Sequence, residues 1–313
     1  MFAAEAKARD RPGTLEDVPL LLSPGQGSQS AGMLTPWLDL PDARPTVERW
    51  SDRTGLDLIG LGTSASADEV RATEVAQPLL TVVALLSGRA LLGGAAPDAV
   101  CGHSIGELSA LALAGVMTDD DAVALAAGRG ALMAEAAAVR PTTMAAVLGG
   151  TVDEDDLAAA GLEVATVNVP GQVVVGGPVE ALDAWTPPAG ARVRRLDVAG
   201  AFHTSAMAPA VDGFTALVEQ TAATDAVCDV VANGDGAVLR DGRELMRRLV
   251  GQLTRPVRFD LCLQSLSASE HGSGATEAVE LAPAGVLAGM AKRALPGVPV
   301  TALRTPADLP VHA

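Results

Sequence analysis

The stretch that decides the fold is DAVCGHSIGELSALAL, residues 98–113. Residues 98–101 form a short, mainly apolar run that is typical of a buried strand, and residues 107–113 are good helix formers. The glycine-flanked segment GHSIG lies between them, at residues 102–106. A strand, a glycine-rich turn and a helix in direct succession predict one unit of a parallel α/β sheet.

The turn itself indicates chemistry at Ser104. In a G-x-S-x-G turn the two glycines allow a sharp bend that lifts the serine hydroxyl out of the sheet, and the following helix supplies backbone N–H donors. Glycine and serine also meet in purely structural turns. The strand–turn–helix context favours a nucleophile at Ser104 over a structural turn.

A serine hydroxyl needs a base, and the chain has four histidines. His312 lies next to the last residue, and His271 lies in a polar loop. His103 is adjacent to the serine, so its side chain should diverge from the hydroxyl and pack or orient. His203 follows an apolar segment, and by elimination it is the predicted base. A lone histidine of this kind is more often a packing residue, but the nucleophile turn reverses that preference.

Other segments extend the α/β pattern. Strands are predicted near residues 19–23, 144–148, 172–176, 192–198, 228–232 and 278–281, and helices near 76–92, 152–160, 179–185, 207–221 and 286–294. After Pro141 the sequence changes to short strand-like runs separated by acidic, alanine-rich segments that are typical of helices. This change predicts a compact βαβ-type subdomain inserted at about residues 138–199. Residues 1–17 are polar and mixed in charge, without the apolar core of a signal peptide, and are expected to form a flexible leader.

Composition limits the classes of function. The net charge of −16, with four Phe, three Trp and no Tyr, argues against a nucleic-acid-binding surface. The three cysteines are odd in number and lack metal-ligand spacing, which favours free thiols in a reducing cytoplasm and no metal site. Apolar runs such as residues 79–86 are too short to cross a bilayer, so no membrane association is expected.

Five motifs together resemble one family. They are PGQGSQ at residues 24–29, GHSIGE at 102–107, GRG at 128–130, GAFH at 200–203 and QLTRPV at 252–257. Their order and spacing resemble the malonyl-CoA:acyl carrier protein transacylase family, which is related to the acyltransferase domains of polyketide synthases. The resemblance runs from about residue 19 to about residue 308, and it is most similar to actinobacterial members.

The resemblance implies an α/β fold of two parts. An α/β-hydrolase-like large domain with a parallel sheet would comprise residues 18–137 and 200–313, and a small ferredoxin-like subdomain would comprise residues 138–199. It implies a cytoplasmic S-malonyltransferase of fatty-acid or polyketide synthesis, with malonyl-CoA as substrate and no tightly bound cofactor. Transfer would be ping-pong, through a malonyl ester of Ser104, to a phosphopantetheinylated acyl carrier protein. A monomer is the family default.

The resemblance also implies roles for single residues. His203 would take the serine proton and return it to the leaving thiol. The backbone N–H groups of Gln26 and Ile105 would form the oxyanion hole, and the backbone carbonyl of Gln252 would orient the base. Asp197, six residues before His203, is expected to be a structural polar residue instead.

Three further residues concern the substrate. Arg129 alone would be interpreted as an exposed helix arginine, but the resemblance implies a guanidinium that holds the malonyl carboxylate bidentately. Phe202 stands where malonyl-selective relatives carry Phe and methylmalonyl-selective ones Ser, so it predicts less room for an α-methyl branch. Gln77 is expected either to line the pocket or to start a helix.

The sequence differs from the family pattern at two places, and it has several basic residues that bear on the carrier protein. Arg255 replaces an Asn found in many relatives, which could change hydrogen bonding beside the base, and residues 280–285 replace a more glycine-rich loop. The family's carrier proteins are strongly acidic. Five basic residues either contact the carrier protein or are simply solvated surface residues. They are Arg192, Arg194, Arg195, Lys292 and Arg293.

Two other functions compete with the transferase. A serine hydrolase or thioesterase of the ordinary α/β-hydrolase kind should have its histidine near the C-terminus, whereas His203 lies mid-chain. A non-catalytic module that only binds acyl carrier protein would not need Ser104, His203 and Arg129 together.

Overall fold

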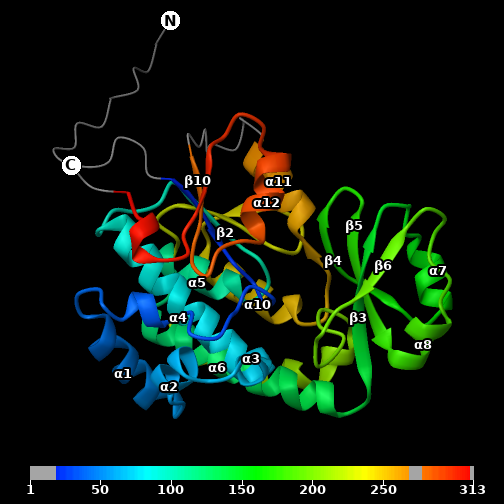
Figure 1. Ribbon diagram of the computed structural model, residues 1–313, viewed down its shortest axis with the longest axis horizontal. Helices are drawn as coiled ribbons and strands as arrows, with labels where there is room; N and C mark the ends of the chain where they lie inside the picture. Colours follow the sequence, from blue (N-terminus) through cyan, green and yellow to red (C-terminus); the bar gives the residue numbers. More distant parts are fainter. Residues whose placement is uncertain (1–18, 268–276, 311–313) are drawn as a thin grey trace, which may run out of the picture.

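The computed structural model describes residues 19–267 and 277–310. It is a mixed α/β structure with two sheets, a six-stranded sheet in the order β11-β10-β1-β2-β7-β8 and a five-stranded sheet in the order β6-β3-β5-β4-β9. Figure 1 shows the five-stranded sheet, with α7 and α8, to one side of the six-stranded sheet and its helices. The expected leader, residues 1–17, lies outside the described residues.

The six-stranded sheet is parallel apart from its last strand. Its strands are β1 (Leu20–Ser23), β2 (Ala99–Gly102), β7 (Asp229–Val231), β8 (Val238–Leu239), β10 (Ala278–Glu280) and β11 (Val300–Ala302). Strand β8 pairs antiparallel with β7. Strands β1 and β2 are buried at every position, as strands covered on both faces must be.

Side chains of these strands alternate between two separate apolar cores. Leu21 and Val100 pack with helices α4 (Thr73–Leu92), α5 (Gly106–Leu113) and α6 (Asp119–Ala138). Leu20, Leu22 and Cys101 pack with α11 (Phe259–Ser267) and α12 (Leu287–Ala294) on the other face. This alternation is the period of two of a β-strand, and it produces a three-layer arrangement.

Helix α4 is long and apolar. Among the described residues it alone has the length and composition to cross a membrane, and 83% of its most apolar window is buried inside the protein. It is therefore a core helix in this structure. It begins at Thr73, so Gln77 lies inside the helix, and the interpretation of Gln77 as a helix-start residue is wrong.

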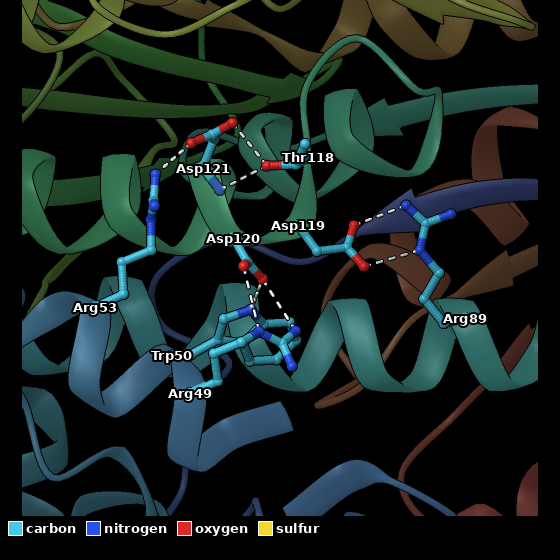
Figure 2. A network of polar contacts seen from close by, with 8 residues as sticks. All are labelled: Arg49, Trp50, Arg53, Arg89, Thr118, Asp119, Asp120 and Asp121. Carbon is cyan, nitrogen blue, oxygen red and sulfur yellow. Dashed lines mark hydrogen bonds and ion pairs between the residues drawn. The ribbon is translucent and has the colours of Figure 1, made fainter. Parts of the chain in front are cut away.

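Helix α6 is fixed at its N-terminus by three consecutive aspartates, Asp119, Asp120 and Asp121 (Figure 2). They bind arginines of two neighbouring helices: Arg49 and Arg53 of α1 (Ala43–Thr54) and Arg89 of α4. Carboxylates are favourable at a helix N-terminus because the exposed N–H groups there carry partial positive charge. This end of α6 is thereby held against α1 and α4. Short helices α2 (Leu58–Thr63) and α3 (Ala67–Arg71) follow α1.

The five-stranded sheet has its own small core. It contains β3 (Thr142–Leu148), β4 (Glu163–Val169), β5 (Gln172–Pro178), β6 (Arg192–Arg195) and β9 (Val257–Arg258), and helices α7 (Glu154–Ala159) and α8 (Val179–Ala184) pack on it. The pairs among β3 to β6 are antiparallel, and β4 and β9 are parallel. Strand β9 comes from far along the chain and links this sheet to the segment that carries Gln252.

Two predicted elements differ from the structure. The helix expected at residues 207–221 begins as a 3-10 turn, Ser205–Ala210, before α9 (Val211–Glu219), and Pro209, which has no N–H to donate, lies in that turn. The strand expected at residues 192–198 ends at Arg195. The structure also contains α10 (Gly242–Gln252), and two further short 3-10 turns at Thr35–Trp37 and Pro306–Asp308.

Candidate active site

Ser104 lies on the turn between β2 and α5, in a left-handed backbone conformation with φ of 55°. Such a conformation is costly for a residue with a side chain, and the flanking glycines explain how it is reached. A Cβ at Gly102 would stand 2.2 Å from the backbone N of Glu107, and one at Gly106 would stand 2.2 Å from the carbonyl oxygen of Ser23. Only glycine lets the chain pass itself this closely.

His203 is the partner of the serine. Its Nε2 lies 2.7 Å from Ser104 Oγ, and its Nδ1 lies 2.8 Å from the backbone carbonyl oxygen of Gln252. The carbonyl can only accept, so Nδ1 carries the proton and Nε2 is free to accept from the hydroxyl. Burial, with the charge of Arg129 as a second cause, lowers the pKa of His203 to about 3, so the ring is neutral at pH 7.

Arg129 comes from α6 and is 1% exposed. Its Nη1 donates to Gln77 Oε1 and its Nη2 to Gln252 Oε1, each at 2.7 Å. Burial lowers the pKa of Arg129 to about 10, so the guanidinium stays charged at pH 7. No ion pair joins Arg129 to a carboxylate within residues 19–267 and 277–310. A buried cation is thus held by two neutral amides.

A cavity of about 460 Å³ opens beside the serine. Ser104, His203, Phe202, Gln26 and Gln77 line it. The other lining residues come from the loops that follow β1, β2 and β6, from α6, from the five-stranded sheet and from the start of α12: Gly25, Gly27, Ser28, Gln29, His103, Met133, Met144, Ala146, Thr166, Asn168, Gln172, Val174, Arg194, Leu196, Asp197, Val198, Val286, Leu287 and Met290. Arg129, Gln252 and Ile105 do not line it. Arg129 instead contacts the cavity wall through the side chain of Gln77.

Two backbone N–H groups near the serine lack acceptors. Within the described parts of the chain, the amides of Gln26 and Ile105 donate to no other group, whereas the amide of Ser104 itself donates to Asn233 Oδ1 at 2.7 Å. Ile105 directly precedes α5, where the first N–H groups of a helix have no intrahelical partner. Unpaired donors of this kind are suited to bind an anion.

The remaining predicted residues lie apart from the serine hydroxyl. His103 turns away, with its Nε2 2.9 Å from Asn168 Oδ1 and its ring edge-on to Phe259, and burial lowers its pKa. Asp197 has an 81% exposed side chain and pairs with Arg71 at 3.1 Å, so it does not orient the base. Arg255 is exposed. His271 and His312 lie outside the described residues.

Two buried polar residues beside the serine were not predicted as site residues. They are Asn233, which follows β7, and Glu107, in the first turn of α5; they are 1% and 3% exposed. A polar residue at the carboxyl end of a parallel strand is a usual position for a functional group, and this signal could have identified Asn233. Among the described residues there is no group of three or more His, Cys, Asp or Glu that could hold a metal ion.

A serine on a strand–helix turn, a neutral histidine in contact with it and a buried arginine next to the cavity define a serine acyl-transfer enzyme. Sequence comparison agrees, because residues 21–303 match the acyl transferase domain family. The chain is 50% identical over 298 residues to the malonyl CoA-acyl carrier protein transacylase of Mycobacterium tuberculosis, covering 92% of this chain and 97% of the relative. It is 35% identical over 304 residues to that of Escherichia coli K12, covering 91% and 96%. The chain therefore belongs to the acyl transferase family, among the malonyl CoA-acyl carrier protein transacylases.

Solved structures give the same relationship. The crystal structure of MCAT from Mycobacterium tuberculosis superposes with a TM-score of 0.87 at 50% identity, covering 93% of this chain and 97% of that chain. A second similar structure is PlMCAT with AntF, described as a type II PKS acyl-carrier protein in complex with its malonyl-transacylase. It has a TM-score of 0.81 at 31% identity and covers 93% of this chain and 97% of that chain.

Proposed function

We propose that this protein transfers a malonyl group from malonyl-CoA to the phosphopantetheine thiol of an acyl carrier protein, through an ester on Ser104. The observation that carries the proposal is the combination of the 2.7 Å Ser104–His203 contact with Arg129, a buried cation without a paired carboxylate. The names of the relatives support the same substrates, and the carrier complex of a relative supports the class of partner.

The first half-reaction forms the ester. Ser104 Oγ attacks the thioester carbonyl carbon while His203 Nε2 accepts the hydroxyl proton. The oxyanion lies near the N–H groups of Gln26 and Ile105, and donors of this kind are typically worth about 3 kcal/mol each. As the tetrahedral intermediate collapses, the carbon–sulfur bond breaks and His203 returns its proton to the CoA thiolate.

The second half-reaction runs the same steps backwards. His203 accepts the proton of the carrier thiol, the thiolate sulfur attacks the ester carbonyl, and the carbon–oxygen bond to Ser104 breaks. The serine oxygen then regains its proton from His203. In both half-reactions the backbone carbonyl of Gln252 accepts from Nδ1–H. This bond stabilises the imidazolium ring in place of the carboxylate that is the third member of a Ser-His-Asp triad.

Arg129 is proposed to bind the malonyl carboxylate. In the resting protein its Nη1 donates to Gln77, which lines the cavity where Arg129 does not, so the Gln77 side chain has to move aside for the substrate carboxylate to reach the guanidinium. This exchange trades a neutral acceptor for a charged one, which makes a stronger hydrogen bond. Phe202, 6% exposed and on the cavity wall, is proposed to leave little room for an α-methyl branch.

The finer structural assignments belong to the same proposal. Residues 18–137 and 200–313 would be the α/β-hydrolase-like large domain, and residues 138–199 the small ferredoxin-like subdomain. A cytoplasmic monomer without a tightly bound cofactor, acting in fatty-acid or polyketide synthesis, stays a prediction from the family.

The test follows the acyl group on the enzyme. After incubation with malonyl-CoA, the mass of the intact protein should increase by one malonyl group, and the group should move to holo-acyl carrier protein faster than to water. Ser104→Ala and His203→Ala should both remove the labelling, and His271→Ala should not. Rapid hydrolysis without transfer would instead indicate a thioesterase, and loss of labelling in His271→Ala would mean that the base is wrongly assigned.

A further inference from the structure

Glu107 is a buried carboxylate to which the proposed mechanism assigns no role. It lies in the first turn of α5, three residues after the serine, and is 3% exposed. A carboxylate is costly to bury unless hydrogen bonds replace its water. Glu107 accepts two such bonds, at Oε1 from the backbone N–H of Asn233 at 2.9 Å and at Oε2 from the side-chain amide of Gln252 at 2.6 Å.

The Gln252 side chain connects this carboxylate to Arg129. Its Nε2 donates to Glu107, and its Oε1 accepts from Arg129 Nη2 at 2.7 Å. An amide has its donors at one end and its acceptor at the other. Gln252 Nε2 also lies 3.2 Å from the backbone carbonyl oxygen of Ser104 and from Asn233 Oδ1, so its contact with Glu107 is the shortest of three. Because the Glu107 carboxylate accepts only and is charged, it is the strongest of these acceptors for the NH₂ end of Gln252, and it favours the orientation in which the amide oxygen faces the guanidinium.

This indirect arrangement keeps Arg129 available. A carboxylate in direct contact with the guanidinium would compete with a carboxylate of the substrate for the same N–H groups. Glu107 instead contacts Arg129 only through a neutral amide, so it supplies a compensating negative charge nearby without occupying the cation. Two of the guanidinium's five N–H groups are used by Gln77 and Gln252, which leaves others for a ligand.

We infer that Glu107 is a positioning residue for malonyl recognition: by fixing the orientation of the Gln252 amide it holds Arg129 ready for the substrate carboxylate. This inference rests on the proposed malonyl transfer. It concerns the carboxylate end of the substrate rather than the acyl-transfer step, because His203 contacts the backbone carbonyl of Gln252, which does not depend on how the side-chain amide is turned.

Glu107→Gln tests this orientation directly. The new side chain has one acceptor oxygen for two donors, the N–H of Asn233 and the NH₂ of Gln252. Either one donor faces another NH₂ group, or Gln252 turns over and presents its NH₂ to the Arg129 cation. The first outcome leaves a buried donor without an acceptor beside Gln252, and the second takes the acceptor away from Arg129, whereas the size of the side chain is nearly unchanged.

The experiment compares malonyl-CoA with acetyl-CoA, which has no free carboxylate, as donors to holo-acyl carrier protein. For Glu107→Gln we expect the KM for malonyl-CoA to rise about 10- to 100-fold, the range for losing a hydrogen bond to a charged group. The kcat for malonyl and the KM for acetyl should change much less. Equal losses for both donors would indicate a merely structural role and overturn the inference.

Leu245→Ala is the matched control. Leu245 is a 2% exposed core residue of α10, nearly two turns before Gln252, so its truncation lowers stability without touching the polar network. It should keep the wild-type ratio of malonyl to acetyl KM, and a change of that ratio equal to that of Glu107→Gln would also overturn the inference. The wild type separates the two proposals, because a wild type without malonyl transfer contradicts the proposed function itself.

The pH dependence of the wild type gives a second readout should Glu107→Gln not fold. Burial raises the pKa of Glu107 to about 7, opposed by the hydrogen bond from Asn233, by Arg129 of α6, by the Gln252 amide and by Arg248 of α10. From α11, Cys262 also faces it, with a raised pKa. A cavity of about 480 Å³ borders Glu107 and Gln252, and its other charged lining residues are Asp235, Glu244, Arg247, Arg248 and Arg255.

Protonation of Glu107 removes its charge and turns one of its two acceptor oxygens into a hydroxyl, so the carboxyl group no longer accepts strongly from both Asn233 and Gln252. The KM for malonyl-CoA should therefore rise as the pH falls from 8 to 6, while the KM for acetyl-CoA stays level. His203 does not produce this change, since its pKa is about 3. Parallel pH profiles for the two donors would overturn the inference.

Discussion

Ser104 and His203 share a left-handed backbone, with φ of 55° and 62°. Such conformations cost of the order of 1–3 kcal/mol each and persist only when the surroundings hold them. Here Asn233 holds the first, because its Oδ1 accepts from the Ser104 N–H and its Nδ2 donates to the carbonyl of Gly102. The hydroxyl and the imidazole therefore meet before any substrate arrives.

Removing the Arg129 side chain should change substrate choice more than it changes acyl transfer. For Arg129→Ala we expect kcat/KM for malonyl-CoA to fall by about 30-fold or more, the cost of truncating one partner of a buried charge pair. Transfer of neutral acyl groups should increase, because a neutral acyl group would no longer lie next to a buried cation that it cannot neutralise. Steady-state transfer to holo-carrier with malonyl-CoA and acetyl-CoA measures both.

Arg129→Lys is the conservative counterpart. It keeps a positive charge but not the planar, bidentate geometry, so it should retain part of the malonyl preference. If Arg129→Ala used malonyl-CoA as well as the wild type does, the assignment of Arg129 to the substrate carboxylate would be wrong.

The sequence alone predicted two residues of the site but not the buried polar residues beside them. Ser104 followed from its turn and His203 from elimination among four histidines, and the structure brings the two together. Glu107 and Asn233 are 126 positions apart, and their contact depends on how β2 and β7 pair. No local pattern encodes that pairing, so their network becomes visible only in the fold.

Single elements explain most differences between prediction and structure. Strand β4 was not predicted, although it lies between β5 and β9. Thr166 and Asn168 interrupt its apolar pattern, and both are buried and line the active-site cavity. Polar residues at functional positions thus weakened the local signal for a strand. Apolar runs such as β1 and β2 were predicted within one or two residues because both their faces are buried.

Helix α6 carries Arg129, and Asp120 in its first turn joins it to α1 by binding Arg49 and Trp50 (Figure 2). Its Oδ1 accepts from Trp50 Nε1 at 2.7 Å, and Trp50 is 2% exposed. Asp120→Ala leaves that indole N–H buried without its partner, which typically costs about 1–3 kcal/mol. We expect the free energy of unfolding, measured by chemical denaturation at pH 7, to fall by that amount.

Asp119→Ala is the comparison for Asp120→Ala. Asp119 occupies the same turn of α6 and pairs with Arg89, whose side chain is 47% exposed. An exposed pair contributes about 1 kcal/mol or less. The helix-terminus charge is lost in both variants, so a larger loss for Asp120→Ala isolates the Trp50 contact. Equal losses would assign the stabilisation to helix-terminus charge alone.

Over the whole molecule the charge is strongly negative, −16, yet basic residues gather beside the active site. Strand β6 is an exposed edge strand with the sequence Arg-Val-Arg-Arg, and Arg194 reaches the wall of the active-site cavity. Arg192 and Arg293 line a neighbouring cavity of about 390 Å³ between the five-stranded sheet and α12. An acidic carrier protein would be attracted to these cations.

Reversing the charge of Arg192 should therefore weaken docking of the carrier. For Arg192→Glu we expect the KM for holo-carrier to rise about 3- to 10-fold at low salt, and the difference to shrink at high salt because exposed charges are screened. The rate at which malonyl-CoA labels Ser104 should change less, since that half-reaction needs no carrier. The two half-reactions are measured separately, by quenched time courses of Ser104 labelling without carrier and by the rate at which holo-carrier removes the label.

The control for Arg192→Glu is Arg44→Glu on α1. Arg44 is also exposed, and Figure 1 shows α1 at the opposite end of the molecule from β6. Both variants change the net charge from −16 to −18, so they alter the overall repulsion of the carrier equally. If the two raised the carrier KM to the same extent, net charge alone would explain the effect and β6 would not be a docking site. A selective, salt-sensitive effect of Arg192→Glu would instead assign the approach of the carrier to the edge of the five-stranded sheet next to the Ser104 cavity.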